Sequence, residues 1–215
     1  MSILKPIRWK TFPRDFLRIQ TGFAIFGFAI ALMVRANLGT SAWAVLEVAL
    51  ARLTGLSIGV MSIIVGLAVL VGALILQEKI GWGTLGNILF IGPWIDLTLW
   101  LIPPVENNPA LQTGMLLSAI FLMGLASALY IGVDAGAGPR DSLMLAIRRT
   151  TGLSLRMARG SLEITVVLLG WLLGGPAGIG TLIFAVLIGP SVQWWFKHLN
   201  VEHHAPAQPN PAATD

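Results

Sequence analysis

The sequence contains 215 residues, of which 55% are hydrophobic and 11% are charged, and its formal net charge is +4. About a quarter of the residues in a soluble domain are charged, so this composition excludes an ordinary water-soluble globule and favours a chain embedded in lipid. The sequence has no cysteine, which excludes disulfides, thiol redox chemistry and thiolate metal sites. The positive residues lie near the ends of predicted helices, so we attribute them to membrane topology and expect no nucleic-acid partner.

A basic segment over residues 1–16 precedes a first membrane unit over residues 17–102. We expect helices over Leu17–Val34, Ser57–Leu76 and Thr84–Ile102, and a shorter segment over Ser41–Leu53. The three helices have close to the ~20 residues that cross the hydrocarbon core, whereas the short segment reaches only about 15–20 Å. Because the short segment also contains Glu47 and Arg52, we predict a re-entrant or interfacial helix there.

A linker over residues 103–115 has no lysine or arginine and leads to a second membrane unit over residues 116–197. This unit is predicted to contain helices over Leu116–Ile131, Ser154–Leu173 and Thr181–Phe196, and a short segment over Asp141–Thr150. Residues 198–215 are rich in proline and alanine without apolar periodicity, so we expect a disordered tail. All three histidines lie in this tail, and we therefore expect no metal site and no cofactor within the membrane.

The two units repeat one pattern at a spacing of 97 residues, without a gap. Gly55-Leu56-Ser57 matches Gly152-Leu153-Ser154, and Ile91-Gly92-Pro93 matches Ile188-Gly189-Pro190. Phe26–Val34 recurs as Met123–Ile131, so the first apolar run belongs to the fold and is not read as a cleaved signal peptide. The sequence thus predicts an all-α polytopic membrane protein with two tandem repeats, each of three spans plus one short helix.

An odd number of crossings in each repeat would insert the second repeat upside down relative to the first. With a cytoplasmic N-terminus, this arrangement places every lysine and arginine inside except Arg35 and Arg52, as the positive-inside rule requires. Both termini are then cytoplasmic and the linker is extracytoplasmic. Parallel repeats with eight crossings are the alternative, and charge alone disfavours them only slightly, since they place Arg35, Lys79 and Arg140 outside.

A candidate solute site lies where each short segment begins. Gly39 and Gly138 stand just before these starts, where unpaired backbone N–H groups give a helix end a partial positive charge. Inverted repeats would bring the two ends from opposite faces toward the middle of the membrane, as in transporters that bind polar or anionic solutes. Arg140 adds a full charge, and Asp141 either caps its helix or pairs with Arg140. The alternative is a glycine-rich loop with an ordinary cap and an interfacial arginine.

Charged residues within predicted spans supply the other candidates, because charge is costly in hydrocarbon. Arg159 and Glu163 lie four residues apart on one helix face, either as part of a gate or a proton-coupling site or as an internal salt bridge that ties this helix to the Pro139-Arg140-Asp141 segment. Asp96 follows a Gly-Pro pair and either lines a solute path or caps backbone groups freed by Pro93.

Other polar and aromatic residues have structural interpretations. Glu47 is either a membrane-site carboxylate or an interfacial one that pairs with Arg52. The tryptophans in the two units are expected to anchor the protein at the membrane interface, and a ligand cage is the alternative: Trp43, Trp94, Trp100, Trp194 and Trp195. Small residues, Gly27, Gly66, Gly72 and Gly124, allow close helix packing in a compact bundle or in a homodimer.

Several stretches resemble the YczE/YitT-type bacterial integral membrane proteins, and the resemblance covers about residues 20–197. They are LGTSAWAVL from Leu38, TGLSIG from Thr54, GAGPRDSLMLAIRRTTGLS from Gly136, ARGSLE from Ala158, GWLLGG from Gly170 and GIGTLIFAVLIGP from Gly178. Members of the family usually carry a proline where this sequence has Ala42, so its first short helix starts less rigidly. The resemblance implies a location in the bacterial cytoplasmic membrane and indicates no particular substrate.

We therefore expect a small channel or secondary transporter for a polar solute, with an anion as one option. The candidate substrate-binding residues are Gly39, Asp96, Gly138, Arg140, Asp141, Arg159 and Glu163. No nucleotide-binding or hydrolase motif occurs, so we expect no enzyme activity. Two alternatives are a non-transporting accessory or scaffold protein of a biosynthetic or secretion complex, and an intramembrane lipid-processing enzyme that would use Asp134 with Asp141.

Overall fold

The computed structural model describes residues 7–78, 80–136 and 138–201. This part of the chain folds into eight helices and contains no extended strand. The helices are α1 (Phe12–Ala36), α2 (Ala42–Thr54), α3 (Ile58–Ile75), α4 (Trp82–Leu101), α5 (Pro109–Ile131), α6 (Pro139–Thr151), α7 (Leu155–Leu172) and α8 (Ile179–His198). Five of them, α1, α3, α4, α5 and α8, are long and apolar enough to cross a membrane. The expectation of an all-helical membrane protein is confirmed.

Helix α7 departs from the expected set of three spanning helices in each half. It has 18 residues, as many as α3. Arg156, Arg159 and Glu163 fall within those residues, whereas α3 contains no charged side chain. Each charged side chain raises the free energy of placing a helix in hydrocarbon, so α7 has the length of a membrane span without the apolarity of the other long helices.

The helix boundaries repeat at the spacing found in the sequence. Helices α6, α7 and α8 each begin and end 97 residues after α2, α3 and α4. The two short helices have 13 residues each. Each of them ends at a glycine in the left-handed region, Gly55 or Gly152, with φ of 73° in both cases.

Helices α1 and α5 begin earlier than the sequence predicts. Helix α1 starts at Phe12, inside the basic segment, and α5 starts at Pro109, inside the linker. Proline occupies the first turn of both helices, where its missing N–H costs no intrahelical hydrogen bond. In α5 the side chain of Asn108 also accepts a hydrogen bond from the backbone N–H of Leu111 at 3.1 Å. The prolines in both helices and the Asn108 cap of α5 favour helix starts in segments that polarity alone assigns to loops.

At the C-terminal end, α8 extends to His198, two residues beyond the expected Phe196. The expected disordered tail beyond Val201, with His203 and His204, and the first six residues of the basic segment lie outside the described residues.

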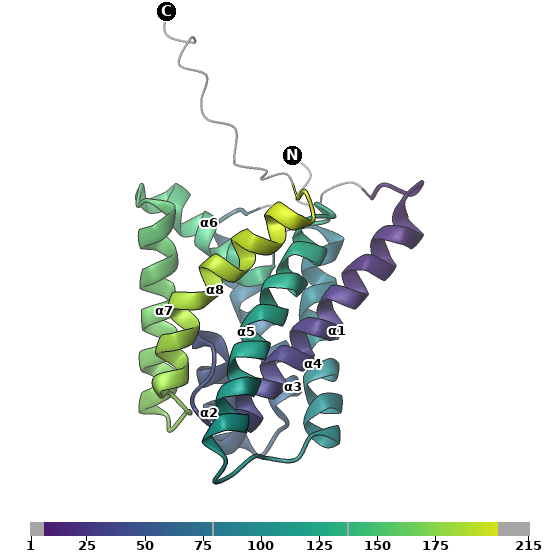
Figure 1. Cartoon of the computed structure of the whole chain (residues 1–215). Coiled ribbons are helices and arrows are strands. Elements are labelled where there is room, and N and C mark those ends of the chain that lie inside the picture. The colour runs from purple at the N-terminus through teal and green to yellow at the C-terminus, as the bar shows by residue number, and fades with distance from the viewer. Residues whose placement is uncertain (1–6, 79, 137, 202–215) are drawn as a thin grey trace, which may run out of the picture.

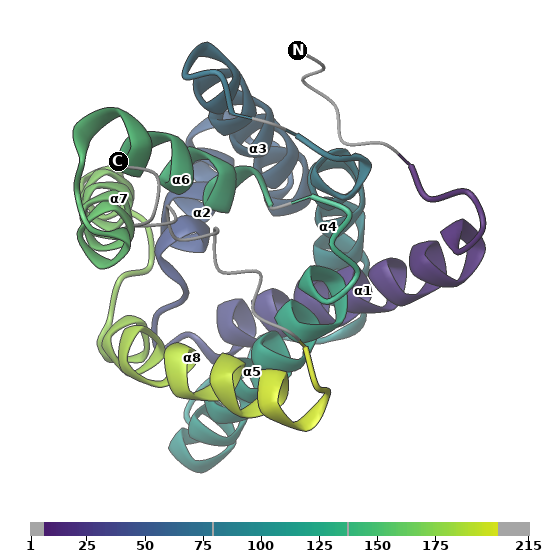
Figure 2. The same cartoon turned by 90° about the horizontal axis from the view of Figure 1, so that it is seen from above.

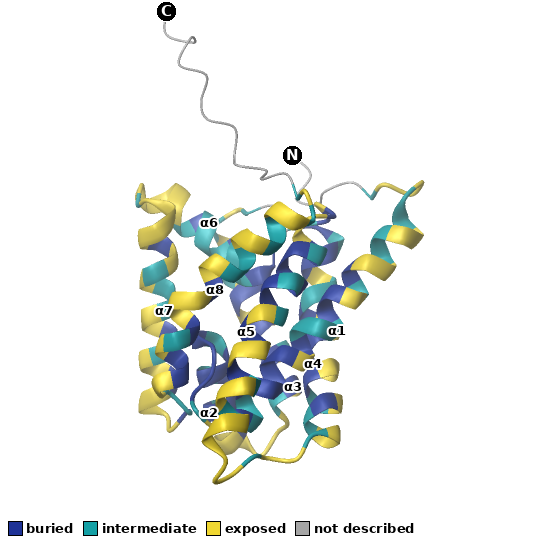
Figure 3. Cartoon of the chain, in the orientation of Figure 1, coloured by how far each residue is buried: buried dark blue, intermediate teal, exposed yellow. Residues whose placement is uncertain are grey.

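Helices α1 and α5 pack against each other and run in opposite directions (Figure 1). Phe23 of α1 and Leu116 of α5 are both fully buried there. Helix α4 packs beside α1 and α8 packs beside α5, and Figure 2 shows the helices arranged in a ring. Exposed side chains cover the outer faces of the long helices (Figure 3), and many of them are large and apolar. A helical bundle surrounded by lipid requires such an apolar outer surface.

Two of the small residues expected to permit close packing do so within the chain. A side chain at Gly27 of α1 would collide with Trp94 of α4 at 2.6 Å. A side chain at Gly124 of α5 would collide with the backbone of Ser191 of α8 at 2.9 Å. These glycines therefore bring α1 close to α4 and α5 close to α8, as expected of small residues that permit close packing within one bundle.

The loops that precede the short helices cross to the opposite half of the chain. Leu38 O accepts a hydrogen bond from Gly180 N–H at 2.7 Å, and Ala135 O accepts one from Gly83 N–H at 3.0 Å. Each loop thereby holds the first turn of α8 or α4. Figure 1 shows α2 toward one end of the bundle and α6 toward the other, and each packs against α7 and α3. The first turns of the two short helices are thus both directed into the interior.

Candidate functional site

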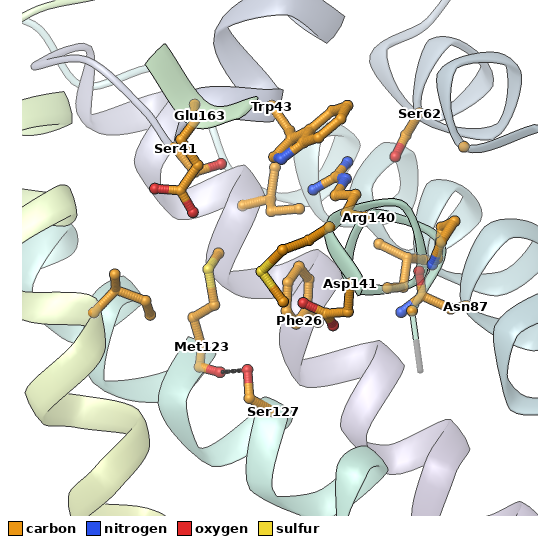
Figure 4. A pocket seen from close by; sticks show the side chains of 18 of the residues that line it. Phe26, Ser41, Trp43, Ser62, Asn87, Met123, Ser127, Arg140, Asp141 and Glu163 are labelled. Atoms are coloured by element: carbon orange, nitrogen blue, oxygen red, sulfur yellow. Dashed lines mark hydrogen bonds between the residues drawn. The ribbon is translucent and has the colours of Figure 1, made fainter. Parts of the chain in front are cut away.

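A cavity of about 180 Å³ lies between the two halves of the chain. The first turns of α2 and α6 both border it, and the opposite walls come from α1, α3, α4, α5, α7 and α8. Its polar wall includes Ser41, Trp43, Arg140, Asp141, Arg159 and Glu163. Many of its other lining residues are apolar, and Phe26 and Met123 face the same space in Figure 4, together with the polar Asn87 and Ser127. The cavity therefore combines charged side chains with apolar ones in its lining.

An ion pair closes one side of the cavity. Arg140, in the first turn of α6, donates a hydrogen bond through Nη2 to Oε1 of Glu47 in the middle of α2. The side chain of Glu47 is 0% exposed, and Ser62 of α3 donates a second hydrogen bond to the same oxygen at 3.2 Å. A buried carboxylate is tolerated only with such partners, so α2, α3 and α6 are joined at this point.

The guanidinium of Arg140 also lies over an aromatic ring. Its Cζ atom is 4.9 Å from the ring centroid of Trp43, in the first turn of α2 (Figure 4). A cation over an indole face is attracted by the ring quadrupole, more strongly where water is scarce. The first turn of α6 is therefore joined to α2 by a cation–π contact and an ion pair that share Arg140.

Two further polar pairs face the cavity. The hydroxyl of Tyr130 on α5 donates a hydrogen bond to Oδ2 of Asp141 at 3.3 Å. On α7, Nε of Arg159 donates to Oε1 of Glu163 at 2.9 Å. The Arg159 side chain is 56% exposed and that of Glu163 is 33% exposed, so this pair is accessible in a way that Glu47 is not. Positive and negative charges are thus closely balanced around the cavity.

Most of the residues predicted from the sequence come together here. Gly138, Arg140, Asp141, Arg159 and Glu163 all line the cavity. The interpretation of Arg159 with Glu163 as an internal pair agrees with the structure, although they bond to each other rather than to the start of α6. Arg140 pairs with Glu47 and not with Asp141.

Gly39 and Asp96 occupy other places. Gly39 has φ of 107°, and a side chain there would collide with Gly178 N at 2.8 Å, so it packs against the start of α8. Oδ1 of Asp96 accepts a hydrogen bond from Gly59 N–H at 2.8 Å. Oδ2 accepts one from the Ser57 hydroxyl at 2.5 Å. Asp96 therefore caps α3 from α4 and is absent from the cavity wall, and it does not cap groups freed by Pro93.

Sequence reasoning assigned two residues of this site to the wrong environment. One interpretation of Glu47 pairs it with Arg52 at the membrane interface. In the structure Arg52 donates to the carbonyl of Gly174 at 3.0 Å, and Glu47 is fully buried. Trp43 was expected at the membrane interface and lies at the cavity. The signal for Glu47 was present in the sequence, because it is the only charged residue among the first ten of an apolar helix. Its partner is 93 residues away, which sequence proximity does not reveal.

The carboxylates considered for a lipid-processing enzyme are not brought together. Asp134 lies 3.8 Å from Arg8 and borders a separate small pocket near the start of α1, whereas Asp141 lies in the main cavity. Among the described residues, no group of three or more Asp, Glu or His side chains is placed to hold a metal ion.

Comparison with known proteins identifies relatives over nearly the whole chain. The family of unknown function DUF6198 matches residues 14–197. An uncharacterized protein of Haemophilus influenzae is 38% identical over 185 residues, which cover 85% of this chain and 84% of the relative. The uncharacterized membrane protein YczE of Bacillus subtilis is 34% identical over 78% of this chain and 79% of its own length. The uncharacterized protein YyaS of the same organism is 30% identical over 78% of this chain and 85% of its own length.

No solved structure matches the chain. The resemblance drawn from the GPRD and GIGT stretches is confirmed in its YczE part, because the family match extends from α1 to the end of α8. The chain therefore belongs to the DUF6198 family of YczE-type membrane proteins.

Proposed function

We propose that the protein is a small channel or secondary transporter for a polar solute, and that the solute binds in the cavity between α2 and α6. The observation that carries this proposal is the convergence of both short-helix starts on one cavity with charged walls. Charged groups inside a membrane protein are costly and occur mainly where they bind or conduct a polar species. Helix starts pointing at a central site are a recurrent way to bind solutes in transporters.

The proposal includes two repeats in opposite orientations. Reciprocal contacts support it, because Arg52 donates to the carbonyl of Gly174 and Arg149 donates to the carbonyl of Gln77. Arg149 is the counterpart of Arg52, and Gly174 is the counterpart of Gln77, each at the 97-residue spacing. Such an exchange of partners is expected of units related by a two-fold axis. The opposite directions of α1 and α5 in Figure 1 support an axis across the bundle rather than along it.

For the orientation, we propose that both ends of the chain face the cytoplasm in a bacterial cytoplasmic membrane. The start of α1 and the end of α8 lie at one end of the bundle (Figure 1). Basic residues lie in the first turns of α1 and in the last turn of α8, and α6 ends with Arg148 and Arg149. The positive-inside rule assigns such residues to the cytoplasm.

The charges in the cavity favour a solute that carries both signs over a simple anion. Arg140 is already paired with Glu47, and Arg159 with Glu163, so neither arginine offers an uncompensated positive charge. Asp141 adds a negative group beside them. A zwitterion can bind to the arginines through its anionic group and to the carboxylates through its cationic group, which compensates the partial disruption of either pair.

Uptake into proteoliposomes tests this function. The wild-type protein should take up radiolabelled glycerophosphoethanolamine, a soluble zwitterion, faster than protein-free vesicles. The double variant Glu47→Gln with Arg140→Gln removes both charges and retains hydrogen-bonding groups, and it should lose this uptake. Arg52→Ala is the matched control, because Arg52 lies outside the cavity wall and should leave uptake unchanged.

A panel of zwitterionic, anionic and cationic solutes extends the test. If the wild-type protein moves none of them, the transport proposal fails. A stable co-purifying partner in that case would favour the accessory or scaffold function instead. If the double variant transports as well as the wild type, the assignment of the site fails.

A further inference from the structure

The two halves of the chain differ at one interface. Helices α3 and α4 pack against each other, but their counterparts α7 and α8 make no more than marginal contact. Both α7 and α8 nevertheless border the cavity, through Leu162 and Glu163 on one side and Ile188 and Val192 on the other. One wall of the cavity is therefore formed by two helices that do not close on each other.

Two substitutions between the repeats change the packing at this interface. In the first half, Gly59 of α3 and Gly92 of α4 touch through their backbones, and a side chain at Gly92 would also meet Ile63 at 3.0 Å. In the second half, Arg156 stands in place of Gly59 and Gly160 in place of Ile63. A side chain at Gly160 or at Gly189, the counterpart of Gly92, would meet nothing within 4 Å. The contact that closes α3 on α4 is thus replaced by open space.

The polar bridge across the interface is missing too. Asp96 of α4 bonds to Ser57 and to the N–H of Gly59, which ties α4 to the start of α3. Its counterpart on α8 is Gln193, which is exposed and, in the described part of the chain, has no hydrogen bond to α7. A large arginine and a lost carboxylate therefore keep the start of α7 separate from the end of α8.

The gap left between α7 and α8 is bordered by the outer faces of these two helices. The outward side chains next to it are apolar and exposed, including Ile164 at 63% and Val186 at 71%. In a membrane this face contacts lipid tails. Arg156 and Arg159 lie in the first turns of α7, and Lys197 lies in the last turn of α8. The surface beside this gap is thus apolar along its length and basic at one end. It complements one lipid leaflet, whose tails are apolar and whose headgroups carry anionic phosphates.

We propose that the solute of this transporter is an amphiphile that enters sideways from the bilayer between α7 and α8. This inference rests on the proposed function and names the substrate class of the same site. The zwitterionic head binds among Arg140, Asp141 and Glu163, and the alkyl chain lies between α7 and α8, beside Ile188 and Val192. A cavity with charged and apolar walls and a side opening to lipid suits both parts of such a molecule.

Filling the opening tests this inference without touching the charged residues. Gly160→Trp and Gly189→Trp place a large side chain where the structure has room for it. Both changes replace a helical glycine, so helix propensity improves rather than falls. Gly114→Trp on α5 is the matched control, because that exposed glycine also has nothing within 4 Å and does not line the cavity.

The probe is phosphatidylethanolamine with an NBD-labelled acyl chain, in vesicles that contain the wild-type protein or a variant. Movement between leaflets is followed by dithionite quenching, and glycerophosphoethanolamine uptake is measured in parallel. The wild-type protein and Gly114→Trp should accelerate lipid movement. Gly160→Trp and Gly189→Trp should lose that acceleration and still take up the soluble headgroup, which needs no opening to lipid.

The two proposals fail in different ways in this experiment. Uptake of the soluble solute without any acceleration of lipid movement overturns the amphiphile inference and leaves transport standing. Undiminished lipid movement in both tryptophan variants overturns the route between α7 and α8. If the wild-type protein moves neither the lipid nor the soluble headgroup, the amphiphile inference is overturned, and absence of uptake across the whole solute panel overturns transport itself.

Discussion

Arg140 in the first turn of α6 bonds to Glu47 in the middle of α2, although 93 residues separate them in the sequence. Glu47 is completely buried, and its second oxygen, Oε2, has no hydrogen-bond partner in the described part of the chain. A single arginine therefore compensates a carboxylate that water does not reach. This pair joins the two halves of the chain at the wall of the cavity.

Removal of one member of this pair should cost far more stability than removal of both. Arg140→Met leaves a buried carboxylate without its charge partner, which should lower the free energy of unfolding by about 3–5 kcal/mol. The double variant Arg140→Met with Glu47→Met should recover most of that loss, because apolar groups replace the whole pair. Denaturant titration of the protein in detergent micelles measures both. Equal losses in the single and double variants would show that the pair is not coupled in this way.

Asp96 should prove to be a helix cap and not part of the solute path. Asp96→Ala removes the acceptor for the Gly59 N–H and the Ser57 hydroxyl, so stability should fall by about 1–2 kcal/mol. Solute uptake per folded molecule should stay at the wild-type value. Gln193→Ala, at the equivalent place in the second half, should change neither quantity. A loss of uptake without a loss of stability would return Asp96 to the solute path.

Substitutions at Gly39 and Gly55 distinguish the cost of backbone strain from the cost of a steric clash. Both have positive φ, so alanine at either position should cost about 1 kcal/mol of backbone strain. At Gly55 nothing lies within 4 Å of an added side chain, whereas at Gly39 it would collide with Gly178 N and the side chain of Thr181. Gly39→Ala should therefore destabilise the protein by several times as much as Gly55→Ala in thermal unfolding. Similar losses at both positions would mean that the loop before α2 does not pack tightly on α8.

Much of the fold follows from the sequence because it depends on local pattern. The 97-residue spacing of the two copies predicted one short helix in each half, and the bounds of α2 and α6 follow that spacing. Polarity alone predicts later starts for α1 and α5, because it ignores the prolines in their first turns.

The candidate site was predicted as far as single residues stand out in an apolar context. Arg140, Asp141, Arg159 and Glu163 were found because charge in a membrane segment is costly. The partners of Arg140 and Asp141 were not predicted, since Glu47 and Tyr130 are brought to them by tertiary packing. The role of Asp96 depends on the close approach of α3 and α4, which no local pattern specifies.

The relative orientation of the halves can be read from two equivalent threonines. Thr54 ends α2 and Thr151 ends α6, and both are exposed. The chain has no cysteine, so Thr54→Cys and Thr151→Cys each create a single thiol. In intact cells, a membrane-impermeant maleimide should label Thr54→Cys, and it should label Thr151→Cys only after the membrane is opened. Labelling of both from the same side would contradict inverted repeats.

The central claim is that a polar solute occupies the cavity at the starts of α2 and α6, and one cysteine there tests it most directly. Met144 of α6 lines the cavity, so Met144→Cys in proteoliposomes should react with a small charged methanethiosulfonate reagent. Glycerophosphoethanolamine should slow this reaction at concentrations that saturate uptake. It should leave Val186→Cys, on the lipid-facing side of α8, unaffected. A thiol at position 144 that reacts at the same rate with and without every solute of the panel would contradict the account.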